Sequence, residues 1–219
     1  MNWATEIATY VFSTVGALLP IVNPLSAVGT LVAITANLTE AERDEQVKRA
    51  CIYMFLILTT FLIAGGLIMN FFGISIPGLR ITGGLIVSFL GFKMLFPDQG
   101  AISGQERAEA ALKQDISFTP LAMPSLSGPG SIAVIIGIAS TAQRSEHMIV
   151  DHALVAIGIA ITAFISYLVL RAASRLNGVL GTTGMNAISR IMGFLLICIG
   201  VQFVINGVLE IVRGVMATT

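Results

Sequence analysis

Four stretches of the sequence are long, apolar and almost free of charge. They are Ala50 to Phe72, Ile76 to Phe96, Ala153 to Leu170 and Ile188 to Val212. A helix of about 20 such residues crosses the hydrocarbon core of a bilayer, so each run is long enough to span a membrane. The composition agrees, because only 11% of the 219 residues are charged, against about 25% in a soluble domain. The chain is therefore predicted to be an all-α membrane protein.

The remaining composition argues against several other classes of protein. The 12 Lys and Arg balance the 12 Asp and Glu, so we expect no nucleic-acid partner. Cys51 and Cys198 lie far apart in apolar runs and form neither a disulfide framework nor a zinc-binding spacing. The sequence has no phosphate-binding loop and no dinucleotide fingerprint. We therefore expect no enzyme activity, no metal site and no cofactor.

Two further apolar runs are longer than one span and carry prolines near their middle. They are Ile7 to Ala36, interrupted by Pro20 and Pro24, and Ile116 to Ala142, interrupted by Pro120, Pro124 and Pro129. As one straight helix the first run would be about 45 Å long, well beyond a core of about 30 Å. Proline removes a backbone donor and kinks or ends a helix. We expect both helices to break at mid-membrane, the second between Pro124 and Ser131, which gives six transmembrane segments.

The two halves of the chain resemble each other. Pro20-Ile-Val-Asn-Pro24-Leu-Ser26 corresponds to Pro124-Ser-Leu-Ser-Gly-Pro129-Gly-Ser131, and Arg80-Ile-Thr-Gly83 corresponds to Arg190-Ile-Met-Gly193. Each half holds three segments, and because three is odd the second half must enter the membrane inverted. The prediction is two inverted three-helix repeats, residues 1–96 and 116–219, joined by a polar cytoplasmic linker over residues 97–115. This architecture is typical of secondary transporters.

Basic residues are distributed unequally over the two sides of the predicted bundle. If both broken segments cross, nine Lys and Arg lie on the side of the loops near Asn37, Pro97 and Arg171, and three lie on the other. The richer side is then cytoplasmic and both termini are periplasmic. If the broken segments re-enter on the same side instead, the count becomes eight against four. The bias favours six crossings by one residue.

The two breaks are the predicted substrate site. Free amide groups at mid-bilayer depth must be buried in protein or line a wet cavity. Two positive helix ends that face one cavity suit a carboxylate, and neighbouring hydroxyl groups add donors. The alternative is that the prolines and glycines only kink the helices and the serines bond back to the backbone. The predicted binding residues are Asn23 as N-cap, Pro24, Ser26, Ser127, Gly128, Pro129, Gly130 and Ser131.

Few other polar residues lie inside the spans. Arg80 and Arg190 match across the repeat and are either gates or interface anchors. Gln202 and Asn206 share a helix face and either line the cavity or serve interhelical hydrogen bonds. Glu210, near the end of its run, is expected to be solvated. No Asp or Glu occupies the middle of a span, so the sequence indicates no proton carrier and no particular coupling ion.

Four segments resemble the MarC family of bacterial inner-membrane proteins. They are Asn23-Pro24-Leu-Ser, Phe72-Gly-Ile-Ser-Ile-Pro-Gly-Leu-Arg-Ile-Thr-Gly-Gly-Leu-Ile-Val, Pro120-Leu-Ala-Met-Pro-Ser-Leu-Ser-Gly-Pro-Gly and Ala187-Ile-Ser-Arg-Ile-Met-Gly-Phe-Leu-Leu-Ile-Cys-Ile-Gly-Val-Gln-Phe. The resemblance covers nearly the whole chain and implies a six-span inner-membrane protein. Some members of the wider family transport small neutral amino acids such as glycine and alanine. The family takes its name from a multiple-antibiotic-resistance locus, which does not establish drug export.

Three functions are compatible with these patterns. The first is a secondary transporter that moves a small neutral amino acid by alternating access. The second is a passive channel for small neutral solutes, because two facing helix dipoles repel cations. The third is a non-transporting membrane partner or export accessory protein. A small-molecule substrate and membrane lipid are the predicted partners, and a spacing such as Gly84 to Ser88 is too common in membrane helices to indicate an oligomeric state.

Overall fold

The computed structural model describes residues 3–35, 37–96, 115–142 and 147–216, and every regular element in them is a helix. The helices are α1 (Trp3–Val22), α2 (Pro24–Ile34), α3 (Glu40–Phe72), α4 (Ile76–Leu95), η1 (Ser117–Leu126), α6 (Pro129–Ala142), α7 (Met148–Arg171) and α8 (Ala173–Met216). Five spans are long and apolar enough to cross a membrane, and the bent pair η1 and α6 makes a sixth if it is counted as one span. The predicted all-α membrane fold is confirmed.

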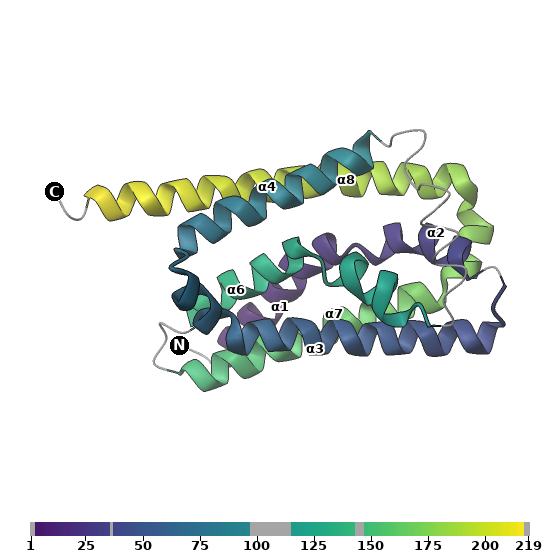
Figure 1. The fold of residues 1–219 in the computed structure, drawn as a ribbon, viewed down its shortest axis with the longest axis horizontal. Coiled ribbons are helices and arrows are strands. Elements are labelled where there is room, and N and C mark those ends of the chain that lie inside the picture. Colours follow the sequence, from purple (N-terminus) through teal and green to yellow (C-terminus); the bar gives the residue numbers. More distant parts are fainter. Residues whose placement is uncertain (1–2, 36, 97–114, 143–146, 217–219) are drawn as a thin grey trace.

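Both broken segments run from one end of the bundle toward the other. Figure 1 shows that α1 begins and α6 ends at the end of the molecule where α8 also ends. α2 ends and η1 begins toward the opposite end (Figure 1). This path favours crossing over re-entry, and the first and last helices start and finish at the same end. The assignment of that end to the periplasm stays a prediction.

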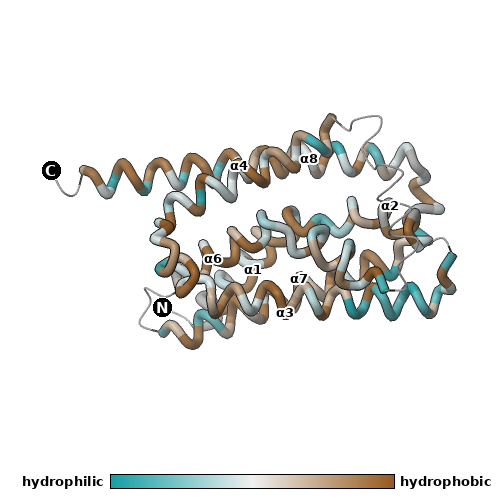
Figure 2. Tube along the Cα trace, in the orientation of Figure 1, coloured by the Kyte–Doolittle hydropathy of each residue, from teal (hydrophilic) through white to brown (hydrophobic). Residues whose placement is uncertain are grey.

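The core surrounds the broken segments, which are covered by α3 and α7. Its fully buried large side chains include Leu18, Val22, Val28, Leu31, Met54, Leu58, Leu62, Leu121, Leu126, Ile135 and Ile159. Large apolar side chains also lie on outer faces, among them Phe71 at 85% exposure and Phe89 at 58%. Such faces are stable in lipid, whose tails are as apolar as the side chains. Figure 2 shows hydrophilic residues gathered along the first turns of α3.

α4 and α8 lie side by side (Figure 1), and glycines allow their backbones to touch. A Cβ on Gly91 would lie 2.6 Å from the carbonyl oxygen of Gly193, and a Cβ on Gly193 would lie 2.8 Å from that of Gly91. A Cβ on Gly84 would overlap the carbonyl oxygen of Gly200, which also packs against Ser88. The Gly84 to Ser88 spacing therefore packs within one chain. The pair joins the third segment of each predicted repeat, which is compatible with inverted repeats.

Two helices extend beyond the apolar runs that predict them. α3 begins at Glu40, well before the run that starts at Ala50. A capping box fixes this start, because the backbone N–H of Thr39 donates to Glu42 Oε2 over 2.8 Å and the N–H of Glu42 donates to Thr39 Oγ1 over 3.3 Å. α8 begins at Ala173 and is interrupted at Gly181, whose φ of 60° is left-handed.

The predicted linker lies almost wholly outside the described residues, because only Asp115 of residues 97–115 is described. Asp115 sits where η1 begins and accepts hydrogen bonds from the hydroxyl group of Ser117 over 2.5 Å and from its N–H over 2.9 Å. These bonds lower the pKa of the Asp115 carboxyl group, with a further contribution from the charge of Arg49. An ionised Asp115 thus caps the start of the second broken segment.

Candidate functional site

The first break falls at a single residue. Asn23 has a left-handed backbone with φ of 44°, and Pro24 is the first residue of α2. Asn23 Oδ1 accepts a hydrogen bond from the backbone N–H of Ser26 over 3.3 Å, so the predicted N-cap is confirmed. The Asn23 side chain is 6% exposed, and its amide donates to Met94 Sδ of α4 over 3.5 Å. A thioether is a weak acceptor, so this buried amide group has a poorly matched partner.

The second break is longer than predicted and begins before Pro124. Thr119 and Met123 have extended backbones inside η1, because a residue that precedes proline is pushed out of the helical region. The chain then bends by 61° between η1 and α6, and α6 begins at Pro129 as expected. By contrast, Ile7–Gly29 passes as one span across the first break. The two broken segments therefore differ in shape: the second bends sharply at its break, and the first continues as one span.

Ser127 and Ser131 at the second break are buried and poorly satisfied. Ser127 is 0% exposed, and its Oγ has no hydrogen-bond partner in the described part of the chain. Ser131 is 2% exposed and donates to the carbonyl oxygen of Leu126 over a long 3.4 Å. The first amide groups of α6 also lack partners within the helix, as at any helix start. A buried hydroxyl group therefore lies beside the positive end of α6 with no acceptor among the described residues.

Glycines bring the two breaks together against α4. A Cβ on Gly130 would lie 2.8 Å from Val87 Cγ2 of α4 and 3.3 Å from Ile21 Cγ2 of α1. Ile21 is two residues before Asn23, whose amide contacts α4 through Met94. A Cβ on Gly128 would lie 2.9 Å from the carbonyl oxygen of Pro124, so neither glycine has room for a side chain. α4 thus contacts both breaks, at Asn23 through Met94 and at Gly130 through Val87. Asn23, Gly128, Gly130 and the two serines are each buried.

A cavity of about 210 Å³ begins one turn further along α6. It is lined by Ala17 of α1, Leu79, Arg80 and Gly83 of α4, Ala133, Val134, Gly137 and Ile138 of α6, and Phe203 and Asn206 of α8. Arg80 and Asn206 provide its polar side chains, and the rest of the lining is apolar. A Cβ on Gly83 would lie 2.6 Å from the Cβ of Ala133, so α4 and α6 touch there. Both residues line the cavity, and Ala133 is the lining residue of α6 that is nearest in sequence to the start of the helix at Pro129.

A second cavity of about 390 Å³ continues toward the end of the molecule where α4 begins. Its lining is Ile76, Arg80, Ser140, Asn206, Leu209, Glu210 and Arg213, so the two cavities share Arg80 and Asn206. Arg80 Nη1 donates to Glu210 Oε2 over 2.8 Å. Glu210, which was expected to be solvated, lines this cavity with its side chain 28% exposed and is paired with Arg80 between α4 and α8. Arg80 is therefore more than an interface anchor.

The other polar residues of α8 differ in their surroundings: one lines the cavities and another is exposed. Gln202 Nε2 donates to Asn206 Oδ1 over 3.0 Å, and Asn206 lines both cavities. Arg190, which corresponds to Arg80 in the repeat, is exposed on α8. The two matching arginines therefore differ in environment, since Arg80 is in an ion pair and Arg190 is exposed. No residue near Arg80 in the sequence signals that it pairs with Glu210. Among the described residues, no three His, Cys, Asp or Glu are arranged to hold a metal ion.

Comparisons with known proteins identify relatives over almost the whole chain. Residues 8–212 match the model of a family described as MarC family integral membrane protein. The UPF0056 inner membrane protein MarC of Escherichia coli (strain K12) is 45% identical over 207 residues, which cover 90% of this chain and 92% of that protein. The protein of the same name in Shigella flexneri has the same identity and coverage. No solved structure matches the chain significantly.

Proposed function

This chain belongs to the MarC family of integral membrane proteins and is a multi-pass protein of the inner membrane, and from that premise we propose that it is a secondary transporter of small neutral amino acids. The substrate class is a zwitterion of the size of glycine or alanine. Its carboxylate is held at the two half-helix starts, at Asn23–Pro24 and Ser127–Ser131. Transport proceeds by alternating access, the mode common to folds with paired broken helices.

The buried hydroxyl group of Ser127 is the observation that carries this proposal. A buried donor without an acceptor costs about 1–3 kcal/mol, and here it lies next to the free amide groups that begin α6. A carboxylate would accept hydrogen bonds from both, and the positive end of α6 would favour its charge. The Asn23 amide would exchange its weak bond to Met94 for a bond to the same ligand.

The two cavities supply a route toward the breaks. The inner cavity of about 210 Å³ is smaller than the 300–1,000 Å³ typical of sites for drug-sized ligands, which favours a small solute. Arg80 offers a positive charge to an entering carboxylate. Gly83 and Ala133 bring α4 and α6 into contact at the wall of the cavity, and in the proposed cycle the two helices move apart there. Because both side chains are minimal, a small displacement opens the path.

Counterflow in liposomes tests the proposal. Purified protein is reconstituted in vesicles that are loaded with glycine, alanine or serine, and uptake of the labelled amino acid is followed. A carrier shows stimulation of uptake by substrate on the opposite side, and we expect Asn23→Ala to reduce it. Ser166→Ala is the matched control, because Ser166 is a buried serine of α7 that donates only to the backbone of Thr162.

The same experiment separates the alternatives. A passive channel gives uptake without stimulation from the opposite side. A membrane partner or export accessory protein gives no uptake, and its activity in cells would depend on residues 97–115 and be unaffected by Asn23→Ala. Absence of both binding and movement of glycine, alanine and serine would overturn the transport proposal.

A further inference from the structure

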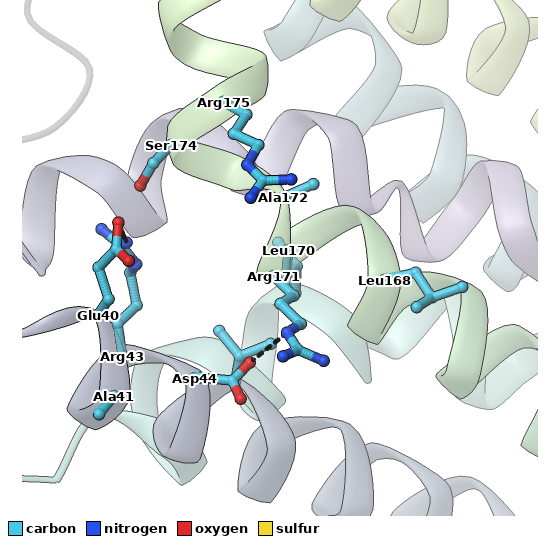
Figure 3. A pocket seen from close by; sticks show the side chains of 11 residues that line it. Glu40, Ala41, Arg43, Asp44, Leu168, Leu170, Arg171, Ala172, Ser174 and Arg175 are labelled. Atoms are coloured by element: carbon cyan, nitrogen blue, oxygen red, sulfur yellow. Dashed lines mark ion pairs between the residues drawn. The ribbon is translucent and has the colours of Figure 1, made fainter.

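A cavity of about 500 Å³ lies at the opposite end of the molecule from the Arg80–Glu210 pair. It is enclosed by the first turns of α3, the end of α7 and the start of α8, and its polar lining is Glu40, Arg43, Asp44, Arg171, Ser174 and Arg175. Figure 3 shows these side chains arranged around a common space, with Arg43 and Arg175 reaching it from different helices. We call it the arginine pocket. It belongs to the end where hydrophilic residues gather on α3 (Figure 2).

Arg43 is the most enclosed of the three arginines and is poorly neutralised. Its side chain is 16% exposed, and its ion pair is with Glu40, at 3.8 Å between Nη2 and Oε1. The Glu40 side chain is 93% exposed, so solvent screens this pair and it contributes little. A guanidinium group carries five donors in a rigid fork. Arg43 therefore presents largely unused donors and charge to the cavity.

The remaining charges of the pocket leave it positive. Arg171 Nε lies 3.3 Å from Asp44 Oδ1, and Asp44 also accepts the hydroxyl hydrogen of Tyr167 at 3.2 Å. Asp44 lines the pocket too, but its carboxylate is already engaged by Arg171 and Tyr167. Arg175 has no acidic partner among the residues that the structure describes. The pocket lining therefore holds three arginines and two carboxylates. One of these carboxylates, that of Glu40, is 93% exposed, so solvent screens its charge.

We propose that the arginine pocket binds a phosphate-type oxyanion, with Arg43 and Arg175 as its main ligands. Arginine recognises phosphate through paired, charge-assisted hydrogen bonds, and the Ser174 hydroxyl group adds a donor from the start of α8. Arg171 stays with Asp44 and contributes charge at longer range. The ligand joins α3 of the first repeat to the α7–α8 corner of the second. Its phosphate belongs either to an anionic lipid headgroup at the membrane surface or to a soluble molecule.

Thermal unfolding in a neutral detergent tests the pocket with inorganic phosphate as the probe. Phosphate is titrated against chloride at constant ionic strength, because salt alone screens surface charge. We expect a saturable rise in Tm for the unaltered protein and an apparent affinity about tenfold weaker in Arg43→Gln and in Arg175→Gln. Arg190→Gln is the matched control, because it removes one exposed arginine outside the pocket, and it should bind as the unaltered protein does.

A second experiment, with lipids, identifies the source of the phosphate group. Native mass spectrometry measures lipid retained by protein taken from vesicles of phosphatidylglycerol or of phosphatidylcholine. Retention of phosphatidylglycerol that both pocket variants lose, without an effect of free phosphate, assigns a lipid headgroup. A phosphate-dependent Tm that both variants lose assigns a soluble ligand. The proposal is overturned if neither probe binds, or if binding is unchanged in both Arg43→Gln and Arg175→Gln.

Discussion

Arg80 and Glu210, 130 residues apart in sequence, form a hydrogen-bonded ion pair with 2.8 Å between Nη1 and Oε2. Their side chains are 31% and 28% exposed, and both belong to apolar helices that pack along a seam of glycines. Arg80 lines both cavities and Glu210 lines the outer one. The pair therefore joins α4 to α8 at a place where both cavities are lined by Arg80.

Removal of one charge of this pair should destabilise the protein. We expect Arg80→Gln or Glu210→Gln to lower the free energy of unfolding by about 1–3 kcal/mol, because either change breaks a half-buried ion pair between two helices. The exchange of both charges, Arg80→Glu with Glu210→Arg, should recover part of the loss. A double-mutant cycle of unfolding in detergent measures the coupling. Arg213→Gln, in the same cavity but exposed, is the control. A coupling energy near zero would show that the Arg80–Glu210 pair does not stabilise the fold.

The shared lining residue Asn206 should be reachable by water. In a background without Cys51 and Cys198, Asn206→Cys is expected to react with a water-soluble thiol reagent, because Asn206 lines both cavities. Val208→Cys is the matched control on the same helix, where Val208 is 45% exposed and lines neither cavity. Equal reaction rates at the two positions, read by mass spectrometry, would show that the cavity is not a preferred path for water.

The glycine contacts between α4 and α8 should tolerate no side chain. We expect Gly91→Ala and Gly200→Ala each to lower the free energy of unfolding by about 1–3 kcal/mol, because the new Cβ meets backbone atoms that cannot rotate away. Gly16→Ala is the control, since nothing lies within 4 Å of its Cβ position, and alanine favours a helix. Thermal unfolding in detergent measures both effects. Similar Tm values for all three variants would contradict the close packing.

The starts of the two half-helices could be predicted because their signals are local. Asn23 before Pro24 is an N-cap followed by a first-turn proline, and both act within a few residues. The apolar run predicts a start at Ala50 and not at Glu40, because the charged residues that precede the run carry no signal of a membrane span. The capping box of Thr39 and Glu42 is the local signal that marks the true start. The early irregularity of η1 at Thr119 had a signal too, in the proline that follows it.

Other features depend on packing that no local pattern encodes. Arg80 and Glu210 meet only because α4 and α8 lie side by side, and a repeat alignment pairs Arg80 with Arg190 instead. The arginine pocket likewise needs three helix ends to converge on Arg43 and Arg175. Helix ends and breaks are therefore readable from neighbouring residues, whereas contacts between helices follow from how glycines and apolar faces fit.

Ser127→Ala should separate stability from function. The mutation removes a buried hydroxyl group that has no partner in the part of the protein that the structure describes. We therefore expect the free energy of unfolding to rise by about 1 kcal/mol or to stay unchanged. The apparent affinity for alanine, measured in counterflow, should fall by about tenfold, because one hydrogen-bond donor to the substrate carboxylate is lost. Ser166→Ala removes a hydroxyl group that does have an acceptor and should leave transport intact. If Ser127→Ala instead destabilises the protein and transports normally, Ser127 has a structural partner and the site at the start of α6 is wrong.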